Sequence, residues 1–464
     1  MSEVGGSTAV RLQTTRGRAV IGAAALGSGM TFLDGTVVNI ALRTIGKDLG
    51  ASLAELQWIT NGYLLSLASL ILLGGSLGDR YGRRRVFVIG TAWFALASLL
   101  CGLAPTPEVL IAARVLQGIG AALLMPGSLA MIQGSFHPDD RSQAIGAWSG
   151  LGSVSAAIGP FVGGALVQYA DWRWIFLLNL PLAVVTVVVA RRWVPETLDP
   201  HASERFDVPG AVLAAVALGG TTYALIEWGD AFAPWAAAAA LLAAIGFVVV
   251  ERTSSHPMLP LGIFASRTFS AANVVTFLVY GALGAILFFL VLQLQTVGGY
   301  GPLEAGLSTL PLTVCMLFLA ARGGALASRI GPRIPMTVGP IVMAGGTVMF
   351  LGIGPDVNYW TDVLPGFLVF GVGLALMVAP LTATVLAAAS DEHAGVASGV
   401  NNAVARAASL LAVAALPMAV GLGGEEYADP LAFDAAYGQA MVLCALLLLF
   451  GGLFAWATIR NPRG

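Results

Sequence analysis

The stretch GSLGDRYGRRR, at residues 75–85, follows an apolar run near residues 56–78. A related stretch, GALASRIGPR, occupies residues 324–333 and follows a later apolar run near residues 304–326. Gly, Leu, Arg, Gly and Arg recur at the same spacing in both stretches. Repeated halves are typical of membrane transporters, whose substrate site lies between the halves near the middle of the bilayer. The repeat therefore predicts a chain built from two related halves.

The composition is that of a membrane protein. Hydrophobic residues make up 57% of the 464 positions and charged residues only 10%, whereas a soluble domain carries roughly 25% charged residues. The first apolar run is long enough to span a membrane, so we interpret it as a retained helix rather than a signal peptide. Because a span needs about 20 apolar residues, we expect fourteen spans, near residues 19–42, 56–78, 86–104, 108–132, 143–168, 173–190, 208–228, 234–250, 269–294, 304–326, 334–353, 362–386, 394–420 and 436–457.

The distribution of charge predicts that both termini are cytoplasmic. An even number of spans puts the termini on one side. When that side is cytoplasmic, the inward loops hold most of the arginines and the outward loops most of the acids, as the positive-inside rule requires. Arginine-rich usage with a single lysine, Lys47, suggests a bacterium and hence its cytoplasmic (inner) membrane. We predict a cytoplasmic N-terminus, a six-helix bundle, a linker with two extra spans, a second six-helix bundle and a cytoplasmic C-terminus, at residues 1–18, 19–190, 191–268, 269–458 and 459–464.

Several functional classes are disfavoured. The net charge of −2 provides no bulk attraction to nucleic acid. The three cysteines lie inside apolar runs and the four histidines in short polar loops, so neither a metal site nor another cofactor is predicted. The GxxxxGK[ST] phosphate loop is absent, which argues against an ATP-driven pump. No catalytic constellation suits a membrane enzyme, so an enzyme or receptor is only a third alternative.

Four further stretches accompany the loop at residues 75–85, which resembles the loop signature of the major facilitator superfamily. LDGTVVNIAL at 33–42, RVLQGIG at 114–120, Gly152 with GPFVGG at 159–164, and WRWIFLLNLP at 172–181 resemble motifs of its fourteen-helix drug:proton antiporters. The resemblance covers the chain from end to end. It implies the major facilitator fold, two six-helix bundles plus two inserted helices, and proton-coupled export.

Asp34 is the only acid placed deep in a predicted span. An ionisable residue at the bilayer centre costs about 2.5–3.5 kcal/mol on insertion scales and marks a functional site by default. Arg114 is its expected partner, because both residues lie roughly 9–12 Å below the outer helix ends at 1.5 Å per residue. The resemblance implies that the two form a proton-linked charge relay. A fixed ion pair that only packs the helices is the alternative.

Polar and aromatic residues inside other spans are candidates for the substrate cavity. Gln117 lies one helical turn below Arg114, and it either lines the route or bonds a neighbouring helix. The phenylalanines either face the cavity or pack against other helices. The predicted cavity residues are Asn39, Asn61, Gln117, Phe288, Phe289, Gln293, Asn401, Asn402 and Arg406.

Two glycine-containing motifs are predicted to act on conformation. The resemblance implies that Asp79 is part of a latch, pairing with a basic group or helix N-terminus in one state only. Inward-facing charge around a tight turn at Gly82 is the alternative. In helix 5, small residues and proline permit close packing and bending, which is either an exporter feature or ordinary packing. The residues are Gly75, Asp79, Arg80, Gly82 and Arg83 for the latch, and Gly152, Gly159, Pro160, Gly163 and Gly164 for helix 5.

The leading expectation is a monomeric, proton-coupled exporter of amphiphilic, often cationic or neutral, organic compounds. A dedicated exporter of one endogenous product, such as a secondary metabolite or a lysolipid, would use the same fold and stays open. With one deep acid, we expect few protons per cycle. The sequence departs from the family pattern at Arg43, where proline is usual, and at Asn61, in a region where some members carry a second acid.

Overall fold

Every predicted span falls on helical structure in the computed structural model, which describes residues 10–199, 206–389, 394–423, 427 and 429–461. Four of the spans, near residues 173–190, 304–326, 334–353 and 362–386, each fall on two successive helical segments. The first bundle contains α1 (Thr15–Leu49), α2 (Leu53–Tyr81), α3 (Arg83–Gly102), α4 (Pro107–Ser135), α5 (Pro138–Tyr169), α6 (Trp174–Leu177) and α7 (Asn179–Trp193). The inserted pair is α8 (Val208–Ile226) and α9 (Ala233–Thr253), and η1 (Leu261–Ala265) follows it. The second bundle contains α10 (Arg267–Thr296), α11 (Pro302–Ser308), α12 (Leu310–Ile330), α13 (Arg333–Met349), η2 (Phe350–Gly352), η3 (Tyr359–Val363), α14 (Leu364–Ala387), α15 (Ala394–Ala419) and α16 (Pro430–Thr458).

The helices fit the predicted number of spans without establishing it. In the described part of the chain, thirteen helical segments are long and apolar enough to cross a membrane. α5, with 32 residues, falls on the remaining predicted span. The predictions for residues 1–9, 200–205 and 462–464 lie outside the described residues.

Several helices begin before their apolar runs, at N-terminal caps made by polar side chains. α2 begins with a capping box, in which the Ser52 amide donates to Glu55 at 2.7 Å and the Glu55 amide donates to Ser52 at 3.3 Å. α1 begins at Thr15, inside the segment predicted as the N-terminal extension, because the Thr14 side chain accepts from the Gly17 amide. Apolar run length alone therefore underestimates the helices.

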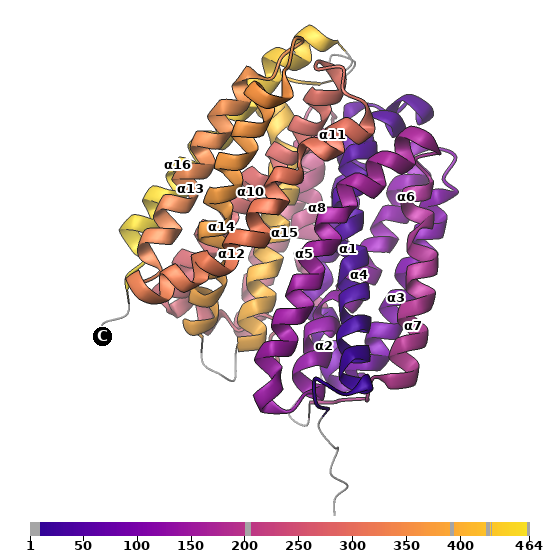
Figure 1. The fold of residues 1–464 in the computed structure, drawn as a ribbon, viewed down its shortest axis with the longest axis vertical. Helices are drawn as coiled ribbons and strands as arrows, with labels where there is room; N and C mark the ends of the chain where they lie inside the picture. The colour runs from indigo at the N-terminus through magenta and orange to yellow at the C-terminus, as the bar shows by residue number, and fades with distance from the viewer. Residues whose placement is uncertain (1–9, 200–205, 390–393, 424–426, 428, 462–464) are drawn as a thin grey trace, which may run out of the picture.

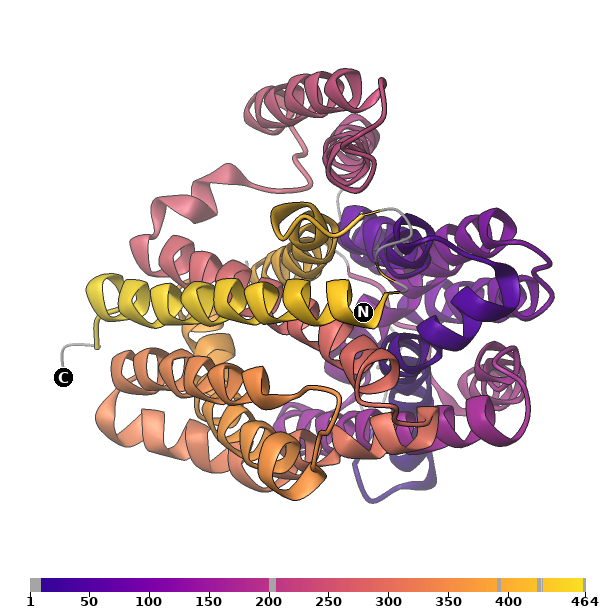
Figure 2. The ribbon, with the colours of Figure 1, turned by 90° about the horizontal axis from the view of Figure 1, so that it is seen from above.

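The two bundles lie side by side, and the inserted helices flank the seam between them (Figure 1). α8 packs against α2 of the first bundle and α15 of the second, while α9 packs mainly against α8. Seen from above, α8 and α9 lie to one side of both bundles (Figure 2). The insertion therefore adds to one edge of the molecule without separating its halves.

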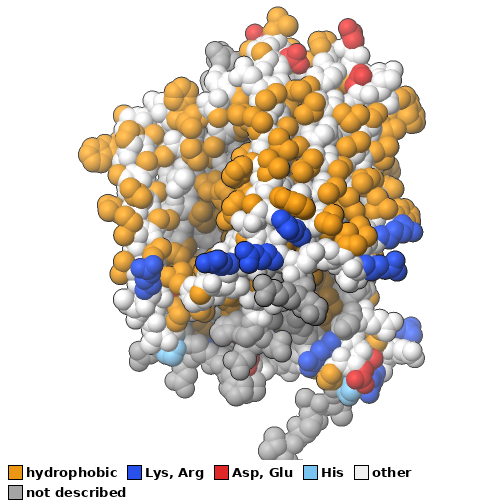
Figure 3. Space-filling view, turned by 90° about the vertical axis from the view of Figure 1, so that its left-hand side faces the viewer, with side chains coloured by type: hydrophobic (Ala, Val, Ile, Leu, Met, Phe, Trp, Pro, Cys, Tyr) orange, Lys and Arg blue, Asp and Glu red, His pale blue; other side chains and the backbone are white. Residues whose placement is uncertain are grey.

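Charged side chains mark two opposite faces of the molecule. In the view of Figure 3, most Lys and Arg side chains gather toward one end of the molecule, where some Asp and Glu also lie. Other Asp and Glu side chains lie at the opposite end, and hydrophobic side chains cover much of the region between. We call the face with the α1–α2 loop the predicted outer face and the opposite face the predicted inner face. Val10 bonds with Ser135 and Asn461 bonds with Ile330, so both described chain ends lie on the predicted inner face.

Hydrogen bonds join the two bundles toward the predicted outer face. The Gln57 amide donates to the Val413 carbonyl at 2.7 Å, and the Gln295 amide donates to the Ile40 carbonyl at 2.9 Å. The Leu303 amide also donates to Gln168 at 3.1 Å. These bonds close the outer ends of the bundles against each other.

Candidate functional site

Asp34 and Arg114 form an ion pair inside the first bundle. Arg114 Nη1 lies 2.5 Å from Asp34 Oδ2, and each side chain is only 1% exposed. α1 supplies the acid and α4 the base, and these helices pack directly against each other. The structure therefore brings together the two residues that we predicted to share one level.

Gln117 completes the coordination of the carboxylate. Its amide donates to Asp34 Oδ1 and to Ser98 Oγ, both at 2.8 Å, and its carbonyl accepts from Arg114 Nη1 at 2.5 Å. Asn179 also donates to Ser98 at 3.3 Å. Gln117 therefore bonds neighbouring helices, which is one of the two roles that the sequence left open for it. The sequence analysis did not identify Ser98, which is a lone polar residue in an apolar run. It also did not identify Asn179 as a site residue, although Asn179 lies in the motif WRWIFLLNLP at residues 172–181.

Arg114 is held on its other side by α2. Its Nε donates to the Ile59 carbonyl at 3.0 Å, and its guanidinium lies 4.4 Å from the ring centre of Tyr63. Phe176 lies on the guanidinium at 5.7 Å. Cation–π contacts and charge-assisted hydrogen bonds offset the cost of burying the cation. No sequence motif indicated Tyr63.

Open space adjoins this network. Gly35 is exposed in the middle of α1, and a side chain added there would meet no neighbour within 4 Å. Asn39 lies one turn further along α1 and has a buried carbonyl oxygen without a hydrogen-bond partner. Asn61 is fully buried with both polar atoms unpaired, and its i+4 spacing from Gln57 puts it on the α2 face toward α15. Both asparagines therefore retain unused hydrogen-bonding capacity near the centre.

The predicted residues of the second bundle separate into two groups. Phe288 and Phe289 are 1% and 0% exposed, and Phe289 stacks on Phe433. Gln293 donates to the Ile353 carbonyl and to Asp434. In this conformation all three residues lie in the packed core of the bundle and not beside an open space.

The polar residues of α15 are more accessible than this first group. Asn401 donates to Thr276 at 2.7 Å and to Asn273 at 3.2 Å, which fastens α15 to α10. Asn402 is exposed. Arg406 is half-buried, and its Nε is buried without a hydrogen-bond partner.

The loop predicted to act as a latch is fastened to the first bundle and to the segment that follows α7. Asp79 pairs with Arg83 at 2.8 Å, while Arg80 stacks on Phe206. Gly82 has φ 108°, a conformation that L side chains rarely adopt, and an added side chain there would meet the Glu196 carboxylate. Gly75, on α2 just before the loop, faces Pro126 of α4.

The second copy of this loop repeats the same local structure. The Arg84 amide donates to Glu196 at 2.9 Å, and at the matching position the Arg333 amide donates to Asn461 at 3.2 Å. Gly331 matches Gly82, with φ 83°. The sequence repeat is therefore a structural repeat, with a carboxylate in the first copy and a neutral amide in the second.

The helix-5 glycines bring α5 close to two helices. A side chain at Gly159 would meet Thr36 and one at Gly163 would meet Val37, both on α1. One at Gly164 would meet the start of α11, in the other bundle. Gly152 faces Phe32, and the Pro160 carbonyl faces Gly306. The motif therefore lets α5 pack closely against α1 of its own bundle and against α11 of the other bundle.

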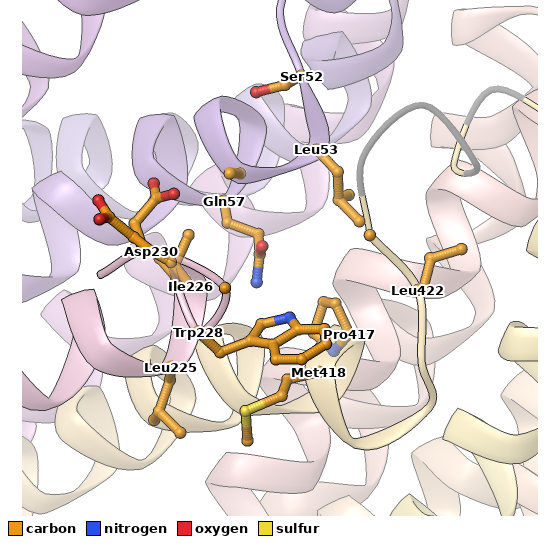
Figure 4. A pocket seen from close by; sticks show the side chains of 14 residues that line it. Ser52, Leu53, Gln57, Leu225, Ile226, Trp228, Asp230, Pro417, Met418 and Leu422 are labelled. Atoms are coloured by element: carbon orange, nitrogen blue, oxygen red, sulfur yellow. The ribbon is translucent and has the colours of Figure 1, made fainter. Parts of the chain in front are cut away.

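A separate pocket of about 350 Å³ lies near the predicted outer face (Figure 4). The ends of α2 and α15 and the α8–α9 loop line it, and none of the predicted cavity residues does. Glu227 accepts from Trp58 Nε1 at 3.1 Å beside it. The Tyr223 hydroxyl and the Phe232 amide, which bond Asp230, hold the pKa of that carboxyl below its ordinary value. The inserted helices thus contribute a negatively charged rim to this pocket.

Comparisons with known proteins agree on the family. The model of the Major Facilitator Superfamily matches residues 24–414. The tetracenomycin C resistance and export protein of Streptomyces glaucescens is 37% identical over 85% of this chain and 74% of its own length. The methylenomycin A resistance protein of Bacillus subtilis (strain 168) is 34% identical over 94% of this chain and 95% of its own.

The fold agrees as well. A bacterial homologue of the human lysosomal transporter Spinster, in an inward-facing and unoccupied conformation, matches with a TM-score of 0.65 at 18% identity, over 96% of this chain and 97% of that chain. At this identity the likeness bears on the fold alone. The family match and the curated relatives cover most of the chain, and this multi-pass membrane protein therefore belongs to the major facilitator superfamily, a family of transporters rather than enzymes.

Proposed function

We propose that this chain exports amphiphilic organic compounds in exchange for protons by alternating access. The observation that carries the proposal is the buried Asp34–Arg114 pair, in a chain whose relatives are named for antibiotic resistance and export. The proposed setting is a bacterial cytoplasmic membrane with both termini in the cytoplasm. The protein is proposed to work as a monomer.

Proton uptake at Asp34 is the proposed coupling step. An ionised Asp34 accepts from both Arg114 and Gln117, and a proton on the carboxylate removes the charge that favours these bonds. Burial favours the neutral form of a carboxyl group, and a nearby cation favours the ionised form. Moving Asp34 between these environments would take up a proton on the outer side and release it on the inner side. With one such acid, the proposed stoichiometry is low.

The large movement is proposed to be a rocking of the two bundles. The hydrogen bonds of Gln57 and Gln295 across the predicted outer face would break as the cavity opens outward. α5 packs on both α1 and α11 through its glycines, so it is positioned to connect movement at the seam to the helix that carries Asp34. The loop around Asp79 would rearrange on the inner face.

A dedicated exporter of one endogenous product is the second candidate. A relative named as a tetracenomycin C resistance and export protein favours it, as does a 36% identical relative named as a probable actinorhodin transporter. Fold and coupling would be the same in both cases. Substrate profiling separates them, because a dedicated exporter would accept one compound and its close analogues only.

The test uses purified protein in proteoliposomes with an imposed pH gradient. Transport of lipophilic cations, anions and neutral amphiphiles is followed together with proton flux, in the parent and in Asp34→Asn. Gradient-driven transport that is lost in the variant supports proton antiport. Equal coupling in parent and variant would refute the role of Asp34, and transport without gradient dependence would indicate a facilitator.

A further inference from the structure

Arg406 lies near the middle of a candidate membrane-spanning helix and has no counter-ion among the described residues. It lies near the centre of the 26-residue α15, about 18–20 Å from either end at 1.5 Å per residue. It makes no hydrogen bond or ion pair with the described residues, and its Nε is buried and unpaired. Arg114, in contrast, is fully buried, pairs with Asp34 through Nη1 and donates to a backbone carbonyl through Nε. A buried unpaired polar group is rare and calls for an explanation.

The neighbouring helices supply no acid for Arg406. Glu55 and Asp79 lie within three residues of the ends of α2, and Asp434 lies in the first turns of α16. Asp34 already accepts from Arg114 and Gln117 through both of its oxygens. The described interior near α15 therefore has an excess positive charge.

Two tyrosines on neighbouring helices lie within electrostatic range of the guanidinium, and an accessible helix face leads to it. Its charge acts on the hydroxyls of Tyr63 on α2 and Tyr280 on α10. Ser398 and Asn402 precede it at intervals of four residues, so the three side chains share one face of α15. Asn402 is exposed and Ser398 half-buried. This face leads from the predicted inner end of α15 to Arg406.

We propose that Arg406 binds an acidic group of the transported compound, so that the preferred substrates are amphiphiles with a carboxylate or a similar oxyanion. The inference rests on the proposed export function and adds the charge of its substrate. A guanidinium presents a planar pair of donors that matches a carboxylate, and charge-assisted hydrogen bonds of this kind are strong. A cationic compound would meet an uncompensated like charge at the same place.

Tyr63 links this site to the proton site. Its ring lies under the Arg114 guanidinium, at 4.4 Å, and its hydroxyl is within electrostatic reach of Arg406. A ligand at Arg406 would therefore act electrostatically on a tyrosine whose ring contacts the partner of Asp34. This arrangement allows substrate and proton sites to affect each other without sharing a residue.

The test compares anthraquinone-2-carboxylate with its uncharged methyl ester, which differ in one charge. Binding to the full-length detergent-solubilised protein is measured by calorimetry at neutral pH, without a gradient, for the parent, Arg406→Gln and Arg406→Lys. We expect Arg406→Gln to weaken binding of the acid about tenfold or more, as the loss of a charge-assisted hydrogen bond implies, and to change binding of the ester less than about twofold. Arg406→Lys should retain part of the affinity for the acid.

Arg322→Gln is the matched control, because Arg322 is also in a span but is exposed and bonds its own helix at Phe318. Unchanged binding of the acid in Arg406→Gln, or equal losses for acid and ester, would overturn the proposal; equal losses would indicate that Arg406 only shapes the cavity. The binding experiment does not measure transport, so its outcome does not depend on the proposed export function. A failure of that function would show in a separate experiment, as the absence of gradient-driven flux of both compounds in proteoliposomes with the parent protein.

Discussion

The Asp34 carboxylate is surrounded by groups that recognise its ionised form. Arg114 and Gln117 both donate to it, and Gln117 is oriented in turn by Ser98. A network of this kind holds the acid in one position as long as it is charged. Protonation weakens each of these bonds at once, which gives a single proton an effect on three helices: α1, α3 and α4.

The geometry of Arg114 predicts that lysine cannot replace it. Arg114 bonds Asp34, Gln117 and the Ile59 carbonyl and stacks on Tyr63, whereas an ammonium is a compact charge without a planar fork. We expect Arg114→Lys to fold but to lose most proton-driven transport, by about tenfold or more. Simultaneous recording of proton and substrate flux in proteoliposomes measures this. Undiminished coupling would show that the pair only packs the helices.

The pairing that the sequence indicated most clearly is that of two charged residues placed deep in apolar spans, where water cannot solvate them. Ionisable residues inside membrane spans often pair with one another, so Asp34 and Arg114 could be paired before their helices were known to touch. Phe289 and Gln293 fit a cavity equally well by sequence, but the structure packs them in the core. The direction in which these side chains point depends on how their helix is rotated about its axis. Because that helix is apolar on all of its faces, the sequence does not show which face points to the cavity.

At the scale of elements, α5 depends on small residues where it meets α1. A side chain at Gly163 would overlap Val37, and in the membrane close packing of this kind is a main source of helix association. We expect Gly163→Ala to reduce thermal stability by about 1–3 kcal/mol and to impair transport. The control is Gly146→Ala on the same helix, where an added side chain meets nothing within 4 Å.

In that control, alanine should be neutral or stabilise the helix by up to about 1 kcal/mol. Thermal unfolding of the two purified variants in one detergent makes the comparison. If both variants behave like the parent, α1 and α5 are packed more loosely than the structure has them, and the helix-5 motif acts in some other conformation.

The repeated loops show how far a sequence repeat predicts local structure. Five matching residues predicted two related halves, and both copies turn at a glycine with positive φ, a conformation that glycine adopts readily because it has no side chain. The partners could not be predicted: Glu196 and Asn461 come from segments that share no offset with the repeat. Long-range contacts of this sort follow from how whole bundles pack, and not from the loop itself.

At the scale of the whole molecule, the two bundles make one closed gate near the predicted outer face. Gln168 of α5 accepts from the Leu303 amide of α11, so this point joins the halves. Alternating access requires these groups to separate in each cycle. A covalent link between them should therefore stop transport while leaving each bundle intact.

We test this with Gln168→Cys and Leu303→Cys joined by a short thiol-to-thiol reagent. The native cysteines, Cys101, Cys315 and Cys444, are buried. The control is a link within the first bundle, Asp48→Cys with Arg173→Cys, whose native side chains lie 2.9 Å apart. We expect the inter-bundle link to abolish gradient-driven transport reversibly on reduction and the control link to retain most of it. Transport that survives the inter-bundle link would mean that the outer gate does not open by separation of the bundles, and that substrate leaves by another route, such as the edge lined by the inserted helices.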